Sequence, residues 1–130
     1  MEFESFYALA QKSLSPVRLN ARVKVGGTVC VLESASGKVY CGKNLVAACG
    51  LGYCAEQGAI TEMLNAGESR IKALLVLDHD GALLPPCGKC LEVMTQLDET
   101  NRNATVYLSK EKTVTVGELY PLDWKQAKGQ

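Results

Sequence analysis

The strongest constraint on the fold of this chain is the order of its predicted secondary structure elements. Strands are predicted over residues 22–33, 38–42, 71–77 and 104–108, and helices over residues 2–13, 54–64 and 87–98. This order contains two strand–helix–strand units, which are typical of helices packed against a mixed sheet. The sequence therefore predicts a layered α/β domain, and only the tail over residues 116–124 has no clear assignment.

The apolar spacing supports the strands on which this interpretation depends. Val23, Val25, Val29 and Val31 alternate in the way that residues of a half-buried strand do. Residues 71–77 instead form a continuous apolar run, which is typical of a strand covered on both faces.

Length and charge narrow the class of protein. The 130 residues fit one domain, 1–130, and 14 acidic residues balance 14 basic ones, so the bulk charge indicates neither a nucleic acid nor a membrane partner. The acidic N-terminus lacks the basic start of a secretion signal, so we expect a cytoplasmic protein. In that reducing compartment the six cysteines suggest metal binding, catalysis or burial more than disulfides.

Two short cysteine-containing segments each stand at the start of a predicted helix: Cys54-Ala55-Glu56 and Pro86-Cys87-Gly88-Lys89-Cys90. Cys87 and Cys90 are three residues apart, so both sulfurs face one side of a first helical turn. A helix N-terminus favours a thiolate, and zinc prefers such sulfur ligands. Cys54 and Glu56 can address the same metal only if Cys54 caps its helix, because two residues turn by roughly 200°.

Three thiolates would leave one position open on a tetrahedral zinc ion, which is typical of a catalytic site. Water at such a position loses a proton near neutral pH. A neighbouring carboxylate can take that proton and deliver it elsewhere. The residues therefore predict a hydrolytic zinc enzyme in which Cys54, Cys87 and Cys90 bind the metal and Glu56 moves the proton.

This pair of motifs resembles the cytidine deaminase family in its all-cysteine zinc form. Further matches follow in order along nearly the whole chain: Val25-Gly26-Gly27, Gly42-Lys43-Asn44, and Glu118-Leu119-Tyr120-Pro121 with Trp124 after it. The resemblance implies a three-layer α/β/α sandwich with a central mixed sheet of about five strands. It also implies replacement of a ring amine by oxygen with release of ammonia, and a homo-oligomer (a tetramer or a dimer) whose subunits complete one another's sites.

The same resemblance implies roles for individual residues. Glu56 would take a proton from water and give it to the ring nitrogen of the substrate. The Ala55 backbone N–H would contact the substrate carbonyl, and the Pro85 carbonyl would accept a hydrogen bond from the departing amine. Asn44 would bind a sugar hydroxyl, and Trp124 would either stack on the substrate or pack in an interface.

Four positions depart from the family pattern, and they concern the substrate more than the chemistry. Val46 stands where the family has a ribose-binding Glu, and Val23 stands where it has a Phe beside the pyrimidine. Gln57 and Leu91 each stand where the family commonly has Arg. A mismatch between a polar site and its substrate costs several orders of magnitude in rate. We therefore expect an aminated pyrimidine-type nucleoside or related heterocycle other than plain cytidine, with a blasticidin S-type deaminase as the alternative.

Three other functions stay open from the sequence. Cys87-Gly88-Lys89-Cys90 alone would suit a thioredoxin-like redox motif. A structural zinc site would need a fourth ligand, which His79 or Cys49 could supply. A binding protein without activity could also keep the zinc fold, although it would have no use for Glu56.

Overall fold

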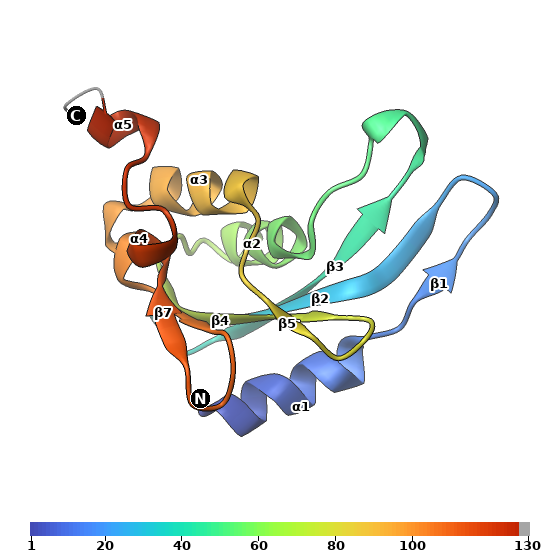
Figure 1. Ribbon diagram of the computed structural model, residues 1–130, viewed down its shortest axis with the longest axis horizontal. Coiled ribbons are helices and arrows are strands. Elements are labelled where there is room, and N and C mark those ends of the chain that lie inside the picture. Colours follow the sequence, from blue (N-terminus) through green and yellow to red (C-terminus); the bar gives the residue numbers. More distant parts are fainter. Residues whose placement is uncertain (128–130) are drawn as a thin grey trace.

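In chain order, the elements of residues 1–127, the part that the computed structural model describes, are α1 (Phe3–Ser13), β1 (Val17–Arg18), β2 (Lys24–Ser34), β3 (Val39–Val46), η1 (Ala48–Gly50), α2 (Ala55–Asn65), β4 (Ile71–Asp78), β5 (Leu83–Leu84), α3 (Gly88–Leu97), η2 (Glu99–Asn103), β6 (Thr105–Tyr107), β7 (Thr113–Thr115), α4 (Val116–Leu119) and α5 (Trp124–Ala127). Figure 1 shows the strands forming one twisted sheet with helices on both of its faces.

The sheet is mixed, as expected. β3 and β4 both run antiparallel to β2, on its two sides, and β7 runs antiparallel to β6. The pair β4–β6 is parallel, and α3 lies in the connection between these two strands. The remaining strands, β1 and β5, have only two residues each and pair with the ends of β2 and β4.

Two apolar layers hold helices against the two faces of the sheet. On one face Phe6 and Ala10 of α1, spaced one helical turn apart, are fully buried against Val31 and Leu75. On the other face α2 and α3 bury residues such as Met63 against the alternate side chains of β2 and β4. β4 therefore has a core on each side, which explains its continuous apolar run. The predicted three-layer α/β/α sandwich is confirmed.

The predicted helices agree with the observed ones to within about a residue at most ends, but the sheet differs in two ways. The second strand, predicted over residues 38–42, continues to Val46 because β3 pairs with the first residues of β2 beyond a bulge. The polar pair Lys43-Asn44 conceals this continuation in the sequence. The short strands β1, β5 and β7 were not predicted, because two or three residues carry no measurable periodicity.

No helix in the described part of the chain combines the length and the hydropathy needed to cross a bilayer.

Gly42 lets α2 approach the sheet closely. A Cβ atom at this position would overlap backbone atoms of α2, namely the Ala55 carbonyl oxygen and the Ala59 nitrogen. We expect Gly42→Ala to lower the free energy of unfolding by about 1–3 kcal/mol, because α2 or β3 must shift to admit the methyl group. Because Cys54 and Glu56 lie at the start of α2, the same shift should weaken zinc binding. Urea denaturation tests this, with Gly88→Ala as control, since a Cβ there meets no atom within 4 Å.

Candidate active site

The starts of α2 and α3 bring the two cysteine-containing segments together. Cys54 is the N-cap of α2 and Cys87 is the N-cap of α3, and both have extended backbone angles. Their Sγ atoms lie 3.2 Å apart, and the Sγ atoms of Cys87 and Cys90 lie 3.1 Å apart. Cys54 therefore caps its helix, as the spacing to Glu56 required.

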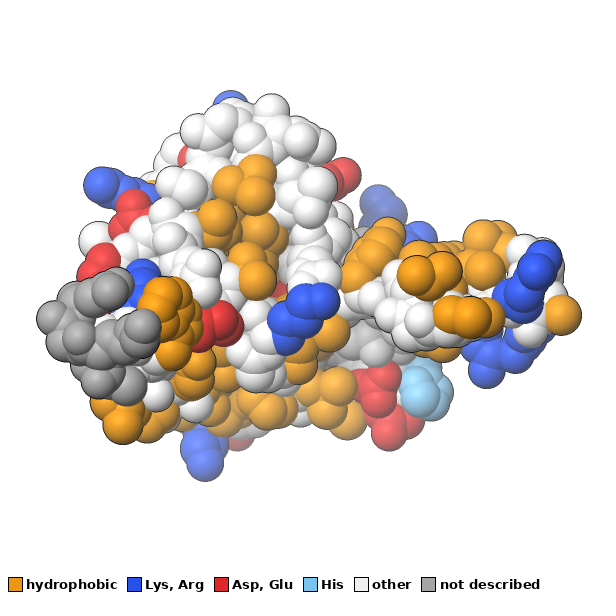
Figure 2. Space-filling model, turned by 90° about the horizontal axis from the view of Figure 1, so that it is seen from above, with side chains coloured by type: hydrophobic (Ala, Val, Ile, Leu, Met, Phe, Trp, Pro, Cys, Tyr) orange, Lys and Arg blue, Asp and Glu red, His pale blue; other side chains and the backbone are white. Residues whose placement is uncertain are grey.

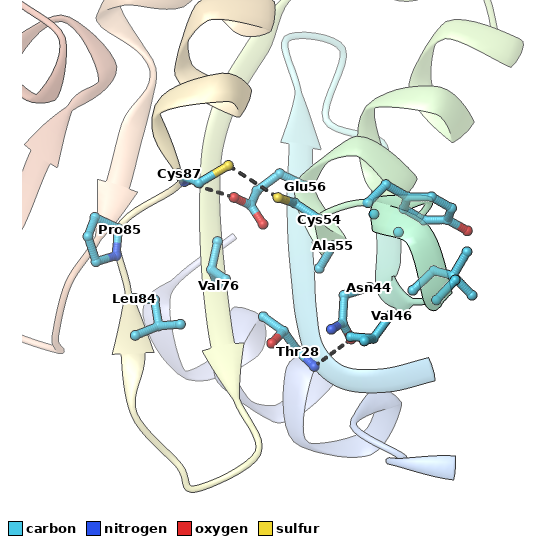
Figure 3. Close-up of a pocket in the computed structure, with 15 residues that line it drawn as sticks. Thr28, Asn44, Val46, Cys54, Ala55, Glu56, Val76, Leu84, Pro85 and Cys87 are labelled. Atoms are coloured by element: carbon cyan, nitrogen blue, oxygen red, sulfur yellow. Dashed lines mark hydrogen bonds between the residues drawn. The ribbon is translucent and has the colours of Figure 1, made fainter. Parts of the chain in front are cut away.

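Glu56 shares this cluster without being exposed. Its side chain is 4% exposed, and its Oε2 accepts a hydrogen bond of 3.1 Å from the backbone N–H of Cys87. The three sulfurs and a carboxylate oxygen of Glu56 all lie within 4.8 Å of one another. This bond fixes one carboxylate oxygen on α3, so the carboxylate is oriented before any ligand binds (Figure 3).

The donor set fits a zinc ion. Thiolates bound tetrahedrally at the usual zinc–sulfur distance lie about 3.8 Å apart, so small movements would bring these sulfurs to ligand positions. Burial raises the pKa values of the Cys54 and Cys90 thiols, and their hydrogen bonds to Cys87 raise them further. A bound cation supplies the charge that ionised sulfurs need here.

Zinc affinity should consequently depend steeply on pH. Cys54 and Cys90 hold their protons to higher pH than an ordinary thiol, and both protons must leave when zinc binds. For these two thiols we expect the apparent affinity to fall by about 100-fold for each pH unit of acidification below their pKa values. Competition with a chelator of known affinity between pH 6 and pH 8 measures this slope. An affinity independent of pH would contradict thiolate ligation.

A cavity of about 500 Å³ opens beside the sulfur cluster, a volume that suits a small-molecule site. Its walls are mainly apolar and include Val46, Val76 and Leu84. Cys54, Glu56 and Cys87 lie at one end of the cavity and Asn44 lies at the other (Figure 3). A flat ring between these ends would meet apolar walls and a carboxylate at one edge.

Ala55, Pro85 and Asn44, which the family resemblance pointed to, all line this cavity. Ala55 is the first residue of α2, where a backbone N–H has no acceptor within the helix. Asn44 is held by Thr28, whose backbone N–H donates to its Oδ1 at 2.9 Å. Thr28 was missed in the sequence, although the preceding Gly26-Gly27 within a strand signals a bulge.

The structure does not bring Val23 or Trp124 to the cavity within one chain. Val23 precedes β2, and its neighbour Lys24 takes the position on the face that carries Val46. Trp124 begins α5, where Lys125 donates to the Thr95 carbonyl near the end of α3 opposite to Cys87. Their predicted contacts with substrate therefore have no support from this chain alone.

Neither suggested fourth ligand joins the sulfur cluster in the described part of the chain. The only group of potential metal ligands there is Cys54, Glu56, Cys87 and Cys90. His79 lies in the turn after β4, with its ring nitrogen 3.1 Å from Asp78 Oδ1, and Cys49 is exposed in η1. This arrangement therefore does not form a closed structural zinc site with His79 or Cys49 as the fourth ligand.

Comparisons with known proteins agree with the geometry. Residues 2–108 match the cytidine and deoxycytidylate deaminase zinc-binding region. A cytidine deaminase from Halalkalibacterium halodurans is 31% identical over 106 residues, which cover 78% of this chain and 76% of that protein. A cytidine deaminase from Mycobacterium tuberculosis is 32% identical over 77 residues, which cover 58% of this chain and 56% of that protein.

Solved structures show the same fold. The crystal structure of cytidine deaminase from Mycobacterium tuberculosis matches with a TM-score of 0.77 at 21% identity, over 95% of this chain and 98% of that one. The enzyme from Mycobacterium leprae matches with a TM-score of 0.75 at 20% identity, over 93% of this chain and 98% of that one. The chain gathers residues that could hold a metal ion at two helix starts, and it belongs to the cytidine and deoxycytidylate deaminase family.

Proposed function

We propose that the chain is a zinc-dependent hydrolytic deaminase that replaces the amine of a cytidine-like aminopyrimidine, or of a related aminated heterocycle, by oxygen. The observation that carries this proposal is the position of Glu56. Its carboxylate is buried within the sulfur cluster and lines the cavity, where a structural zinc site would have no need of it. Relatives that match over much of this chain are named cytidine deaminases, which supports the same reaction.

In the proposed reaction, Cys54, Cys87 and Cys90 would hold zinc, which would supply a water that is nucleophilic at neutral pH. Glu56 accepts a proton from that water and delivers it to the ring nitrogen next to the carbon under attack. Glu56 then takes the second proton from the hydroxyl that has added to the carbon and gives it to the amine. The carbon–nitrogen bond breaks, the amine leaves as ammonia, and the oxygen stays on the carbon as a carbonyl. Each proton transfer uses the same carboxylate, which the Cys87 N–H holds in place.

Ala55 and Pro85 would orient the ring for this step. The Ala55 N–H at the start of α2 suits the ring carbonyl as an acceptor, since helix N-termini favour partial negative charge. Pro85 precedes α3 at the cavity wall, where its carbonyl would accept a hydrogen bond from the departing amine. The apolar walls exclude water from the ring faces, which strengthens both polar contacts.

A panel of amines tests the proposal. Zinc-loaded protein should release ammonia from at least one member of a set containing cytidine, deoxycytidine, cytosine, blasticidin S, aminated purines and pterins. Preference for blasticidin S would favour the alternative branch. If the protein has zinc fully bound and releases ammonia from no member of the panel, the proposal is contradicted. A binding protein that keeps the fold would then be favoured.

We further propose a cytoplasmic homo-oligomer, a tetramer or a dimer. Large apolar side chains are exposed beside the cavity, where Leu51 is 74% and Tyr53 46% exposed, and near the tail, where Leu122 is 68% exposed. An interface would cover such side chains. Light scattering on the eluting protein checks this, and a monomer at micromolar concentration would contradict it.

A further inference from the structure

A second cavity adjoins the candidate active site. It encloses about 540 Å³ and shares Thr28, Asn44 and Val46 with the first cavity. These shared residues lie at the end of the first cavity that is remote from the sulfur cluster (Figure 3). A substrate whose ring lies against Glu56 would therefore extend past Asn44 toward the second cavity.

Two basic residues, Arg18 and Lys24, line this second cavity. In the sheet register Arg18 pairs with Lys24, and Lys24 pairs with Val46, so the three side chains lie in a row on one face. Figure 2 shows Lys and Arg side chains gathered at the end of the arm that projects from the body of the molecule. By the register, the two cations stand on the same face as Val46, at the side of the site away from the sulfur cluster.

No carboxylate among residues 1–127 forms an ion pair with Arg18 or Lys24. Arg18 Nη1 donates to the Asn20 and Ala21 carbonyls of its own loop, at 3.2 and 3.3 Å. Like charges placed directly opposite each other destabilise a strand pair. An anion bound between them would remove that repulsion.

The acidic residue in the same cavity does not supply this anion. Asp78 accepts a hydrogen bond from the Thr28 hydroxyl at 3.1 Å and lies 3.1 Å from the His79 ring nitrogen. A hydrogen bond from the His79 backbone lowers the pKa of Asp78 most. The contacts with the His79 ring and the Thr28 hydroxyl lower it further, so this pKa lies below its usual range. Asp78 is therefore engaged with its neighbours, and the two cations leave the cavity with an excess of positive charge.

Asn44 presents a donor to the boundary between the two cavities. Its Oδ1 accepts the Thr28 N–H, so its Nδ2 amide hydrogens are the groups left to meet a ligand (Figure 3). Val46, which lines both cavities, adds no negative charge there. The end of the site remote from zinc thus offers donors and cations, which suit an acceptor-rich group.

We propose that the substrate carries an anionic group on its sugar, a phosphate or a carboxylate, which Arg18 and Lys24 bind while the ring faces Glu56. This inference rests on the proposed deaminase function and specifies its substrate. Both anions have oxygens that accept charge-assisted hydrogen bonds from Arg and Lys. A ribose hydroxyl would leave the two cations without a partner.

Kinetics on matched compounds test this. Cytidine is compared with its 5′-monophosphate, its 3′-monophosphate and its 5′-carboxylate, with ammonia release as the readout. We expect kcat/KM for at least one anionic compound to exceed that for cytidine by about tenfold or more. The rates with phosphates and with the carboxylate then distinguish the two sources of charge.

Substitution of the two basic residues shows whether they cause the preference for anionic compounds. Arg18→Gln and Lys24→Gln should each lower kcat/KM for the preferred anionic compound about tenfold more than they lower kcat/KM for cytidine. Lys12→Gln, an exposed change on α1 across the sheet, is the matched control and should alter neither rate. Equal turnover of cytidine and of every anionic compound, or an equal loss on both in the two variants, would overturn the inference.

A binding measurement separates this inference from the deaminase proposal. Calorimetry with uridine and with its monophosphates needs no turnover, and the favoured monophosphate should bind about tenfold or more tightly, with an advantage that salt reduces. Absence of ammonia from every compound would contradict the deaminase function alone. Equal binding of uridine and its monophosphates would contradict the anion site, whatever the activity.

Discussion

Replacement of Glu56 by Gln should abolish turnover while leaving the fold and the metal in place. The amide has the shape of the carboxylate, and its oxygen can still accept the hydrogen bond from the Cys87 N–H. It cannot accept a proton from water at neutral pH, so both proton transfers lose their carrier. We expect kcat to fall by about 10²- to 10⁴-fold, the range for loss of a general acid–base group.

The zinc content of the variant and the activity of a control variant show whether the loss of turnover is specific to the Glu56 carboxylate. Zinc content by elemental analysis should stay at about one ion per chain, because the three sulfurs are untouched. Glu111→Gln, at an exposed position before β7, is the control and should keep full activity. A Glu56→Gln protein that deaminates as fast as the unmodified chain would remove Glu56 from the mechanism.

Replacement of Cys90 by Ala should remove both zinc and activity. Cys90 is fully buried, and its sulfur lies 3.1 Å from that of Cys87. Loss of a group that only supports a metal ligand costs about 10- to 100-fold in metal affinity, so loss of a ligand itself should exceed this range. Chelator competition measures the affinity, and ammonia release measures the activity.

Cys30→Ala is the matched control for this variant. Cys30 is also fully buried but lies in β2, outside the sulfur cluster. Both variants should lower the free energy of unfolding by about 0.5–3 kcal/mol, as changes at buried positions commonly do. Only Cys90→Ala should lose zinc, and equal zinc retention in the two proteins would exclude Cys90 as a ligand.

The metal cluster could be predicted from the sequence because its residues lie in two short motifs. Cys87 and Cys90 share one helical turn, and Cys54 and Glu56 share another helix start, so the spacing within each motif limits where the groups can point. The meeting of the two motifs depends on the strand–helix–strand order, which is also readable from hydrophobic periodicity. The layers and the helices α1, α2 and α3 were therefore predicted correctly, whereas the short helices α4 and α5 lie in the tail that had no clear assignment.

The rest of the cavity depends on register, which periodicity does not give. Thr28 reaches Asn44 because the pairing of β2 and β3 shifts between Val25 and Val29. Leu84 reaches the cavity wall from a two-residue strand that has no pattern to detect. Val23 was expected beside the ring, yet the residue that faces the site side is Lys24.

The register also explains what Val46 does, at the position where the family resemblance implied a ribose-binding Glu. In the sequence it only argued against plain cytidine. In the fold Val46 stands next to Lys24, which in turn stands next to Arg18. The uncharged Val46 and the two cations together favour a substrate that itself carries negative charge.

The most direct test of this account is a crystal structure with the anomalous scattering of zinc measured at its absorption edge. We predict one metal ion per chain, bonded to the sulfurs of Cys54, Cys87 and Cys90, with a solvent or substrate atom as its fourth neighbour. Glu56 should lie beside that atom and keep its bond to the Cys87 N–H. Coordination of the metal by Glu56 itself, or a metal elsewhere with these sulfurs apart, would contradict the account.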